Sequence, residues 1–150
     1  MQVSENLDQQ ILNIDEQERY QRHISLKEIG IRGQISLKNS SVIFVGAGGL
    51  GSSAILYGAA AGIGTIGLID NDKIDKSNLQ RQVIHDTHGV GKHKIFSAKS
   101  KIEKLNPNCK IITYLERLNP NNILNIFKNF DIICDCSDNF GTRYLINDAC

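Results

Sequence analysis

The sequence contains no tryptophan, two prolines and four cysteines, and it has no long run of apolar residues. A membrane-spanning helix needs about 20 consecutive apolar residues, so the sequence gives no sign of a membrane protein. Residues 1–6 carry no positive charge, which argues against a secretory signal. The cysteines form neither a CxxC pair nor a plausible disulfide framework, which favours a reducing compartment.

A strong excess of charge is also absent, because the formal net charge is +1 over 150 residues. This near-neutral balance argues against general nucleic-acid binding. The charge is nonetheless uneven: residues 1–75 sum to −3 and residues 76–150 to +4. Most of the positive excess lies between residues 76 and 104, where a local cluster is suited to a small polyanion.

Apolar and polar segments alternate in a way that predicts strands alternating with helices. Strands are expected at residues 41–45, 65–69, 110–115 and 131–135. Helices are expected at residues 15–24, 52–62, 92–106, 120–129 and 139–150, with a turn and a short helical piece at 30–40. This order predicts an α/β fold with a doubly wound, mainly parallel Rossmann-like sheet and N-terminal helices.

The two ends of the chain differ in character. Residues 1–14 are polar and lack turn signals, so we expect a mobile leader there and one domain over residues 15–150. The chain stops within the last expected helix without a capping residue. A domain rarely ends in this way, so we expect the chain to be truncated, either as a fragment of a longer protein or as a truncated gene product.

Cysteines and histidines give no clear metal site. Cys134 and Cys136 alternate at the end of the last expected strand, and we interpret both as core residues. The histidines lack convincing metal-ligand spacing, and we expect surface positions for all four: His23, His85, His88 and His93.

Gly46, Gly48 and Gly51 form a GxGxxG fingerprint directly after the strand at 41–45 and before a helix. Glycines permit a tight turn and close approach of the backbone, and the helix N-terminus presents free N–H groups to a phosphate. Asp70 follows Gly51 by 19 residues at the end of the next strand, where a carboxylate suits ribose hydroxyls. The fingerprint indicates nucleotide binding without distinguishing NAD from ATP, and a purely structural glycine turn is the alternative.

The segment that begins at Asp70 favours a nucleotide with a phosphate chain. Asp70 and Asp72 place two carboxylates where ligands bind in such sheets, although Asp72 is also suited to capping a turn. Polar and basic residues follow, namely Ser77, Asn78, Leu79, Gln80, Arg81 and Lys94. A reaction on a phosphate chain requires cations where negative charge accumulates, whereas hydride transfer is carried by the nicotinamide itself.

Asp138 follows the fourth expected strand and would face the glycine turn if the strand order is 3-2-1-4. A carboxylate beside a bound triphosphate is suited to holding Mg²⁺, which takes one or two carboxylates together with phosphates. The alternative is that Asp138 caps the following helix. Both interpretations stay open on the residues alone, and Asn139, next in the sequence, is a candidate nucleotide-site residue together with Asp138.

Five motifs occur together in this order: RYQRH at 19–23, GAGGLG at 46–51, DNDKIDKSNLQRQ at 70–82, Lys94, and CSDN at 136–139. With them, the chain from about residue 16 onward resembles the ThiF/MoeB family of ubiquitin-activating-like adenylyltransferases. The segments HISLKEIG, QRQVIHDTHGVGKHK and TRYLINDAC are most similar to the molybdopterin-synthase adenylyltransferases of the cyanobacterial and plastid type. Activators of the sulfur carriers of thiamine synthesis and tRNA thiolation are near enough to remain alternatives.

The resemblance implies that Mg-ATP adenylates the C-terminal glycine carboxylate of a small ubiquitin-fold sulfur-carrier protein and that pyrophosphate is released. It implies that Gly49 and its neighbours approach the nucleotide, that Asp70 binds the ribose, and that Asp138 binds Mg²⁺. The phosphates and the charge growing at the α-phosphorus would be held by Asn78, Arg81 and Lys94.

The resemblance also implies a homodimer in which Arg22 reaches into the site of the partner subunit. The implied location is the bacterial cytoplasm or the plastid stroma. Structural zinc, held by two CxxC pairs in longer members of the family, is expected only in a longer form, because these ligands are absent here. Two other classes stay open: an NAD-dependent oxidoreductase and a non-catalytic nucleotide-binding subunit.

Overall fold

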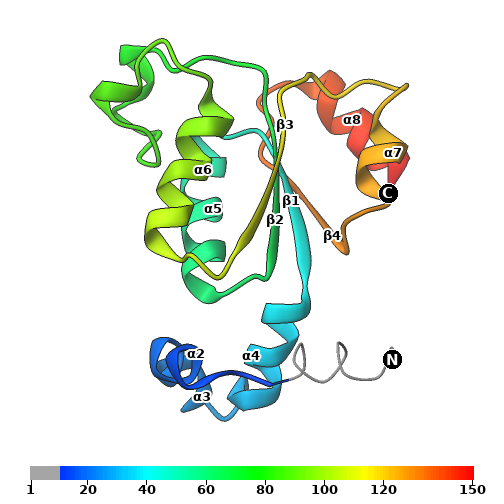
Figure 1. The fold of residues 1–150 in the computed structure, drawn as a ribbon. Helices are drawn as coiled ribbons and strands as arrows, with labels where there is room; N and C mark the ends of the chain where they lie inside the picture. Colours follow the sequence, from blue (N-terminus) through cyan, green and yellow to red (C-terminus); the bar gives the residue numbers. More distant parts are fainter. Residues whose placement is uncertain (1–10) are drawn as a thin grey trace, which may run out of the picture.

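A computed structural model describes residues 11–150, and its centre is a four-stranded parallel sheet (Figure 1). The strands are β1 (Ser41–Val45), β2 (Thr65–Ile69), β3 (Lys110–Tyr114) and β4 (Ile132–Asp135). Their spatial order is β3-β2-β1-β4, which confirms the expected order. Because every pairing is parallel, the carboxyl ends of all four strands lie at one end of the sheet.

Helices cover both faces of the sheet, as the doubly wound fold requires (Figure 1). On one face lie α5 (Gly49–Ala61) and α6 (Lys94–Leu105), and on the other lie α7 (Ile123–Phe127) and α8 (Phe140–Ala149). The long segment between β2 and α6 contains two short 3₁₀ helices, η1 (Lys76–Asn78) and η2 (Thr87–Gly89).

The apolar run of β1 is explained by its position between two cores. Val42 and Phe44 pack in the cluster beneath α5 and α6. Ile43 and Val45 pack in the cluster beneath α7 and α8. A strand buried on both faces has apolar side chains at successive positions, which is the pattern that predicted it.

The helices before β1 differ from the expectation. The helix expected at 15–24 is divided into α2 (Ile14–Arg19) and α3 (Gln21–Ile24). The piece expected to be short is a ten-residue helix, α4 (Gly30–Asn39). Its two glycines lower the intrinsic helix propensity, and the packing of α3 against α4 compensates for it.

The last residues of the expected leader belong to the folded part of the chain. Leu12 is buried, and Asn13 caps α2 through a reciprocal pair of hydrogen bonds with Glu16, both 2.8 Å long. Residues 1–10 lie outside the described residues. The domain therefore begins a few residues earlier than expected.

The N-terminal helices lie at the amino end of the sheet (Figure 1), and hydrogen bonds attach them to α5 and to the end of α6. Nδ2 of Asn106 donates to the hydroxyl of Tyr20 at 2.8 Å and to the carbonyl of Ala59 at 2.7 Å. Nε2 of Gln34 donates to the carbonyl of Ala61 at 2.8 Å. These bonds fix α2, α3 and α4 relative to α5.

Two expectations about single residues have opposite outcomes. His85, expected at the surface, is buried, because both of its ring nitrogens find partners inside the protein. Cys136 is buried beside Cys134, with 3.8 Å between the sulfur atoms, which confirms the core interpretation. Burial raises the pKa of the Cys136 thiol, so it is protonated at neutral pH.

Within residues 11–150, no helix has the length and apolar character to cross a membrane.

Candidate nucleotide site

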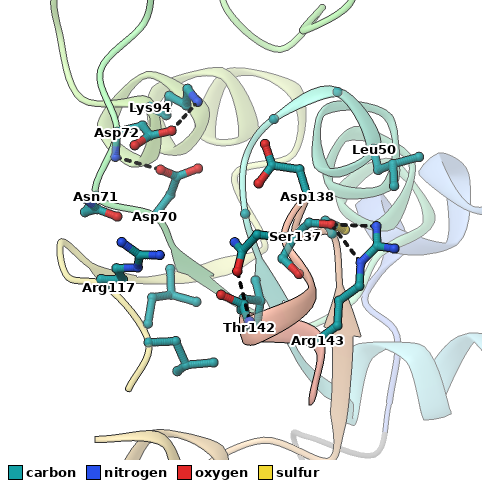
Figure 2. A pocket seen from close by; sticks show the side chains of 18 of the residues that line it. Leu50, Asp70, Asn71, Asp72, Lys94, Arg117, Ser137, Asp138, Thr142 and Arg143 are labelled. Carbon is teal, nitrogen blue, oxygen red and sulfur yellow. Dashed lines mark hydrogen bonds and ion pairs between the residues drawn. The ribbon is translucent and has the colours of Figure 1, made fainter. Parts of the chain in front are cut away.

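A cavity of about 610 Å³ opens at the carboxyl end of the sheet, where ligands bind in open α/β folds (Figure 2). Segments that follow all four strands contribute to its wall. The lining residues fall in the ranges 45–50, 69–72, 81–82, 116–118, 136–139 and 142–143, together with Lys94.

The glycine loop, residues 46–51, connects β1 to α5. Gly46 has a φ of 100°, in the left-handed region that favours glycine, and a Cβ there would lie 3.0 Å from the carbonyl oxygen of Cys136. A Cβ on Gly51 would overlap the carbonyl oxygen of Gly46. The loop places the N-terminus of α5 at the cavity, and no side chain of residues 11–150 caps it. Its N–H groups are available to an anion.

Asp70 holds the glycine loop at the end of β2. Its Oδ2 accepts a hydrogen bond from the backbone N–H of Ala47 at 2.9 Å. Its Oδ1 accepts one from the N–H of Asp72 at 2.7 Å. Because a carboxylate offers about four acceptor positions, both oxygens retain capacity toward the cavity, which Asp70 lines (Figure 2).

Lys94 is a buried cation at the wall of the cavity. Its Nζ lies 3.0 Å from Oδ2 of Asp72, and the side chain of Lys94 is 8% exposed whereas that of Asp72 is 64% exposed. A buried ammonium is costly without a counter-charge, and Asp72 provides one from the solvent side. A phosphate entering the cavity meets an ammonium that is already in place.

The side chains of Arg81 and Gln82 lie against the glycine loop. A Cβ on Gly49 would lie 3.5 Å from Cδ of Arg81, and one on Gly48 would lie 3.6 Å from Nε2 of Gln82. Gln82 is 4% exposed, and its Oε1 has no hydrogen-bond partner among the described residues. Buried polar atoms are rarely left unpaired, so this one marks a place where a ligand or a water completes the bonding.

The helix after β4 is capped by Asn139 and not by Asp138. Oδ1 of Asn139 accepts from the N–H of Thr142 at 2.9 Å. The capping alternative for Asp138 is therefore wrong, and its carboxylate lies at the cavity (Figure 2).

Hydrogen bonds to the N–H and to the carbonyl of Ser137 hold the turn that carries Asp138. The N–H of Ser137 donates to Oδ1 of Asp135 at 2.9 Å. The carbonyl of Ser137 accepts from Nη2 and Nε of Arg143 at 2.9 and 3.3 Å. These bonds hold the position of the aspartate without involving its carboxylate.

The residues at this turn fit a magnesium ion bound together with a nucleotide. The carboxylate of Asp138 accepts no hydrogen bond from residues 11–150, so its oxygens are available. Within the same residues, no group of three His, Cys, Asp or Glu could hold a metal. One carboxylate is enough where phosphate oxygens complete the coordination.

Most of the predicted nucleotide-binding residues meet at this cavity. Those that line it are Gly46, Gly48, Gly49, Asp70, Asp72, Arg81, Lys94, Asp138 and Asn139. Gly51 lies behind the loop, against Gly46 and Cys136. Four others do not line it: Ser77, Asn78, Leu79 and Gln80 lie in or just after η1. There, Asn78 accepts a hydrogen bond from the N–H of Asp75.

Arg22 lies far from the cavity of its own chain. It is an exposed residue of α3, at the amino end of the sheet, whereas the cavity is at the carboxyl end (Figure 1). The structure therefore gives Arg22 no role in the site of the same subunit.

Sequence reasoning missed several lining residues. Arg117 and Leu118 follow β3, Arg143 lies in the first turn of α8, and Asn71 lies between the two aspartates. The rule that ligands bind at carboxyl ends of parallel strands applies to the segment after β3 as well, and it was the signal that could have found Arg117.

Comparisons with known proteins identify the family of the chain. The model of the ThiF family matches residues 20–150. A probable adenylyltransferase/sulfurtransferase MoeZ of Mycobacterium tuberculosis is 49% identical over 138 residues, covering 92% of this chain and 35% of that protein. A probable molybdopterin-synthase adenylyltransferase of Porphyra purpurea is 48% identical, covering 92% of this chain and 36% of the relative.

A solved structure supports the likeness in three dimensions. Escherichia coli tRNA N6-threonylcarbamoyladenosine dehydratase TcdA, in complex with ATP, has a TM-score of 0.81 and 25% identity, covering 86% of this chain and 53% of that one. The chain thus spans about a third of the length of the curated relatives it matches. With the family model matching residues 20–150, the chain belongs to the ThiF family, as its motifs indicated.

Proposed function

We propose that the cavity binds Mg-ATP and that the chain is the nucleotide-binding part of an adenylyltransferase. Its substrate would be the C-terminal carboxylate of a small ubiquitin-fold sulfur-carrier protein. The observation that carries this proposal is the convergence of Arg81, Lys94 and Asp138 on one cavity with the glycine loop. The names of the relatives and the ATP complex of TcdA support it.

The cations argue for a phosphate chain over a dinucleotide. Lys94 is held at the wall by Asp72, and Arg81 lies against Gly49 beside the N-terminus of α5. In adenylation, negative charge grows at the α-phosphate and on the departing pyrophosphate, so fixed cations there stabilise the transition state. Hydride transfer by NAD would leave these cations without a task.

The remaining residues orient the reactants. The N–H groups of the glycine loop bind phosphate oxygens, and the free acceptor positions of Asp70 take the ribose hydroxyls. Asp138 would hold Mg²⁺, which supplies charge neutralisation of the phosphates when bound. No general base is needed, because the attacking carboxylate is ionised at neutral pH.

The finer proposal is that the carrier is the small subunit of molybdopterin synthase, and the name of the Porphyra relative, a probable molybdopterin-synthase adenylyltransferase, supports it. The sequence segments that are most similar to this subgroup support it. Carriers of thiamine synthesis and tRNA thiolation are the alternatives. A pyrophosphate-exchange assay with each purified carrier distinguishes them, since only the matching carrier stimulates exchange.

The proposal includes a homodimer in which Arg22 completes the partner's site. Its support is the distance of α3 from the cavity of its own chain, since a two-fold axis can carry an N-terminal helix to the other crevice. The test mixes Arg22→Ala and Asp138→Ala chains, each extended to the length of the relatives. Recovery of exchange in mixed dimers supports action across the interface, and its absence in proven heterodimers refutes it.

The nucleotide itself is tested by calorimetry on the 150-residue chain. We expect Mg-ATP to bind and NAD to bind more weakly or not at all. Tighter binding of NAD would contradict the proposal, and the Lys94→Ala variant locates any signal at the cavity.

A further inference from the structure

Three residues of the segment 81–85 contact the glycine loop, and their partners are the successive loop residues 49, 48 and 47. Arg81 lies against Gly49, and Gln82 lies against Gly48. His85 then reaches the carbonyl of Ala47, with 3.0 Å between Nε2 and the oxygen. Only the contact of His85 is a hydrogen bond to the loop backbone.

His85 also reaches the helix that carries Lys94. Its Nδ1 lies 3.1 Å from Oγ of Ser97, one turn into α6. The ring is 7% exposed, and burial lowers its pKa. The same imidazole is thus bonded to the glycine loop and to α6.

The partners of His85 determine its tautomer. A carbonyl oxygen only accepts, so Nε2 carries the hydrogen and donates to Ala47. In the neutral ring, Nδ1 then accepts from the hydroxyl of Ser97. Both nitrogens are used, and neither is left for a ligand.

The peptide groups of Ala47 are fixed on both sides. Its N–H donates to Asp70 and its carbonyl accepts from His85. Asp70 lines the cavity, but His85 does not. A buried histidine that contacts a phosphate-binding loop without touching the cavity is placed to position that loop.

We infer that His85 is a positioning residue that sets the glycine loop relative to Lys94, and so sets affinity for the phosphate chain of the nucleotide. The inference rests on the proposed binding of ATP. Loss of the bond from His85 leaves the Ala47 carbonyl without its partner and the loop free to shift from Lys94. The ribose contacts proposed for Asp70 depend less on this spacing, because Asp70 directly follows β2 and is also held by its bond to the N–H of Asp72.

The test compares Mg-ATP and adenosine as ligands of four folded variants of the 150-residue chain. His85→Phe removes both bonds and keeps an aromatic ring, and His85→Gln retains a donor within reach of Ala47. Ser97→Ala removes only the bond to α6. His88→Phe is the matched control, because His88 is an exposed histidine of the same segment.

Calorimetry gives the affinity for Mg-ATP, and NMR titration gives the affinity for adenosine. We expect His85→Phe to weaken Mg-ATP about tenfold, because binding must hold the loop where the buried Ala47 carbonyl has no partner, a cost that the free loop avoids by shifting. Adenosine affinity is expected to change less than about twofold, with His85→Gln recovering most of the loss and Ser97→Ala showing a smaller loss than His85→Phe. His88→Phe should match the wild type.

Each outcome separates the inference from the proposed function. Unchanged Mg-ATP affinity in folded His85→Phe, or equal weakening of both ligands, overturns the inference alone. If His85→Phe does not fold, unchanged Mg-ATP affinity in folded Ser97→Ala, or a tenfold loss in His85→Gln that affects Mg-ATP and adenosine equally, also overturns it. Failure of the wild type to bind Mg-ATP overturns the proposed function as well.

Discussion

Two buried glutamines lie at opposite ends of the sheet and differ in how their polar atoms are paired. Gln34, in α4 at the amino end, donates to the carbonyl of Ala61 and its Oε1 lies 2.9 Å from Nδ1 of His23. Gln82, at the carboxyl end, is 4% exposed and its Oε1 has no partner among the described residues.

The same contrast holds for the surrounding regions. At the amino end, the buried Asn106 bonds to Tyr20 and Ala59. The buried side-chain atoms left unpaired within residues 11–150 are Oγ of Ser52, Oε1 of Gln82, Nδ1 of His93 and Oγ of Ser137. They belong to the first turn of α5, the N-cap of α6 and the segments beside the cavity.

The difference is the one expected if the amino end serves stability and the carboxyl end binds a ligand, as we propose. An unpaired buried polar atom costs roughly 1–3 kcal/mol, and such costs persist where a ligand completes the bonds. The amino end holds its helices by bonds completed within the chain. Substitutions at the two ends should therefore separate stability from nucleotide binding.

The largest effect is expected at the carboxyl end, for Asp138→Ala. Adenylate formation should be abolished, because the Mg²⁺ position is lost with its ligand. Pyrophosphate exchange measures this in a chain extended to the length of the relatives. Asp148→Ala, an exposed aspartate of α8, is the control, and exchange that persists in Asp138→Ala would refute the metal assignment.

Arg81→Ala and Lys94→Ala should act on the rate of the same reaction. The expected loss is about 2.7 kcal/mol or more for each, by analogy with other groups that stabilise transition-state charge. The free energy of unfolding should change little for Arg81→Ala, which is exposed. Lys99→Ala, in α6 with a half-exposed side chain, is the matched control. Exchange at the wild-type rate in both variants would show that these cations are misassigned.

Asn106→Ala should lower stability and leave nucleotide binding nearly unchanged. It removes hydrogen bonds to the Tyr20 hydroxyl and the Ala59 carbonyl, so we expect a loss of about 2 kcal/mol in the free energy of unfolding. Denaturant titration measures the loss, with the exposed Asn147→Ala as control. Mg-ATP affinity should stay within about twofold, and a large fall would mean that the two ends are coupled.

The smallest expected effect is the dependence of the free energy of unfolding on pH. Burial lowers the pKa of His85 in the folded state below its usual value of about 6.5. The unfolded chain therefore binds more protons as pH falls through about 6.5, and stability decreases toward lower pH. Lys94 strengthens this shift, and Asp70 and Asp86 oppose it. The free energy of unfolding, measured by denaturant titration, should fall less between about pH 7.5 and 5.5 in His85→Gln than in His88→Gln. Equal slopes would show that His85 is not the source of this pH dependence.

These contrasts also explain how much the sequence predicted. The strands and the parallel order followed from apolar runs and from alternation with helices, because both patterns reflect burial. Asp138 was predicted at the cavity because it follows a strand with a fixed place in such sheets, whereas the phosphate role of Lys94 came from the resemblance to the family. Arg117 follows β3 and could have been predicted by the same rule. Arg143 and the burial of His85 depend on contacts between distant segments, which no local pattern encodes.

The placement of Ser77–Gln80 outside the cavity has a similar cause. Their polar side chains suggested ligand contacts, but Asp75 and Asn78 form a capping box that orders η1 by itself. A polar segment can satisfy its own backbone as well as a ligand. The role of Asn78 with the phosphates stays a prediction.

The two glutamines give the most direct test of the account. In ¹H–¹⁵N spectra of the assigned side-chain amides, saturating Mg-ATP should shift the Gln82 signals strongly, because the ligand fills the cavity that Gln82 lines. The Gln34 signals, whose bonds are already complete, should stay nearly constant. A Gln82 amide that does not move at saturation, or equal shifts at both glutamines, would contradict the assignment of the carboxyl end as the nucleotide site.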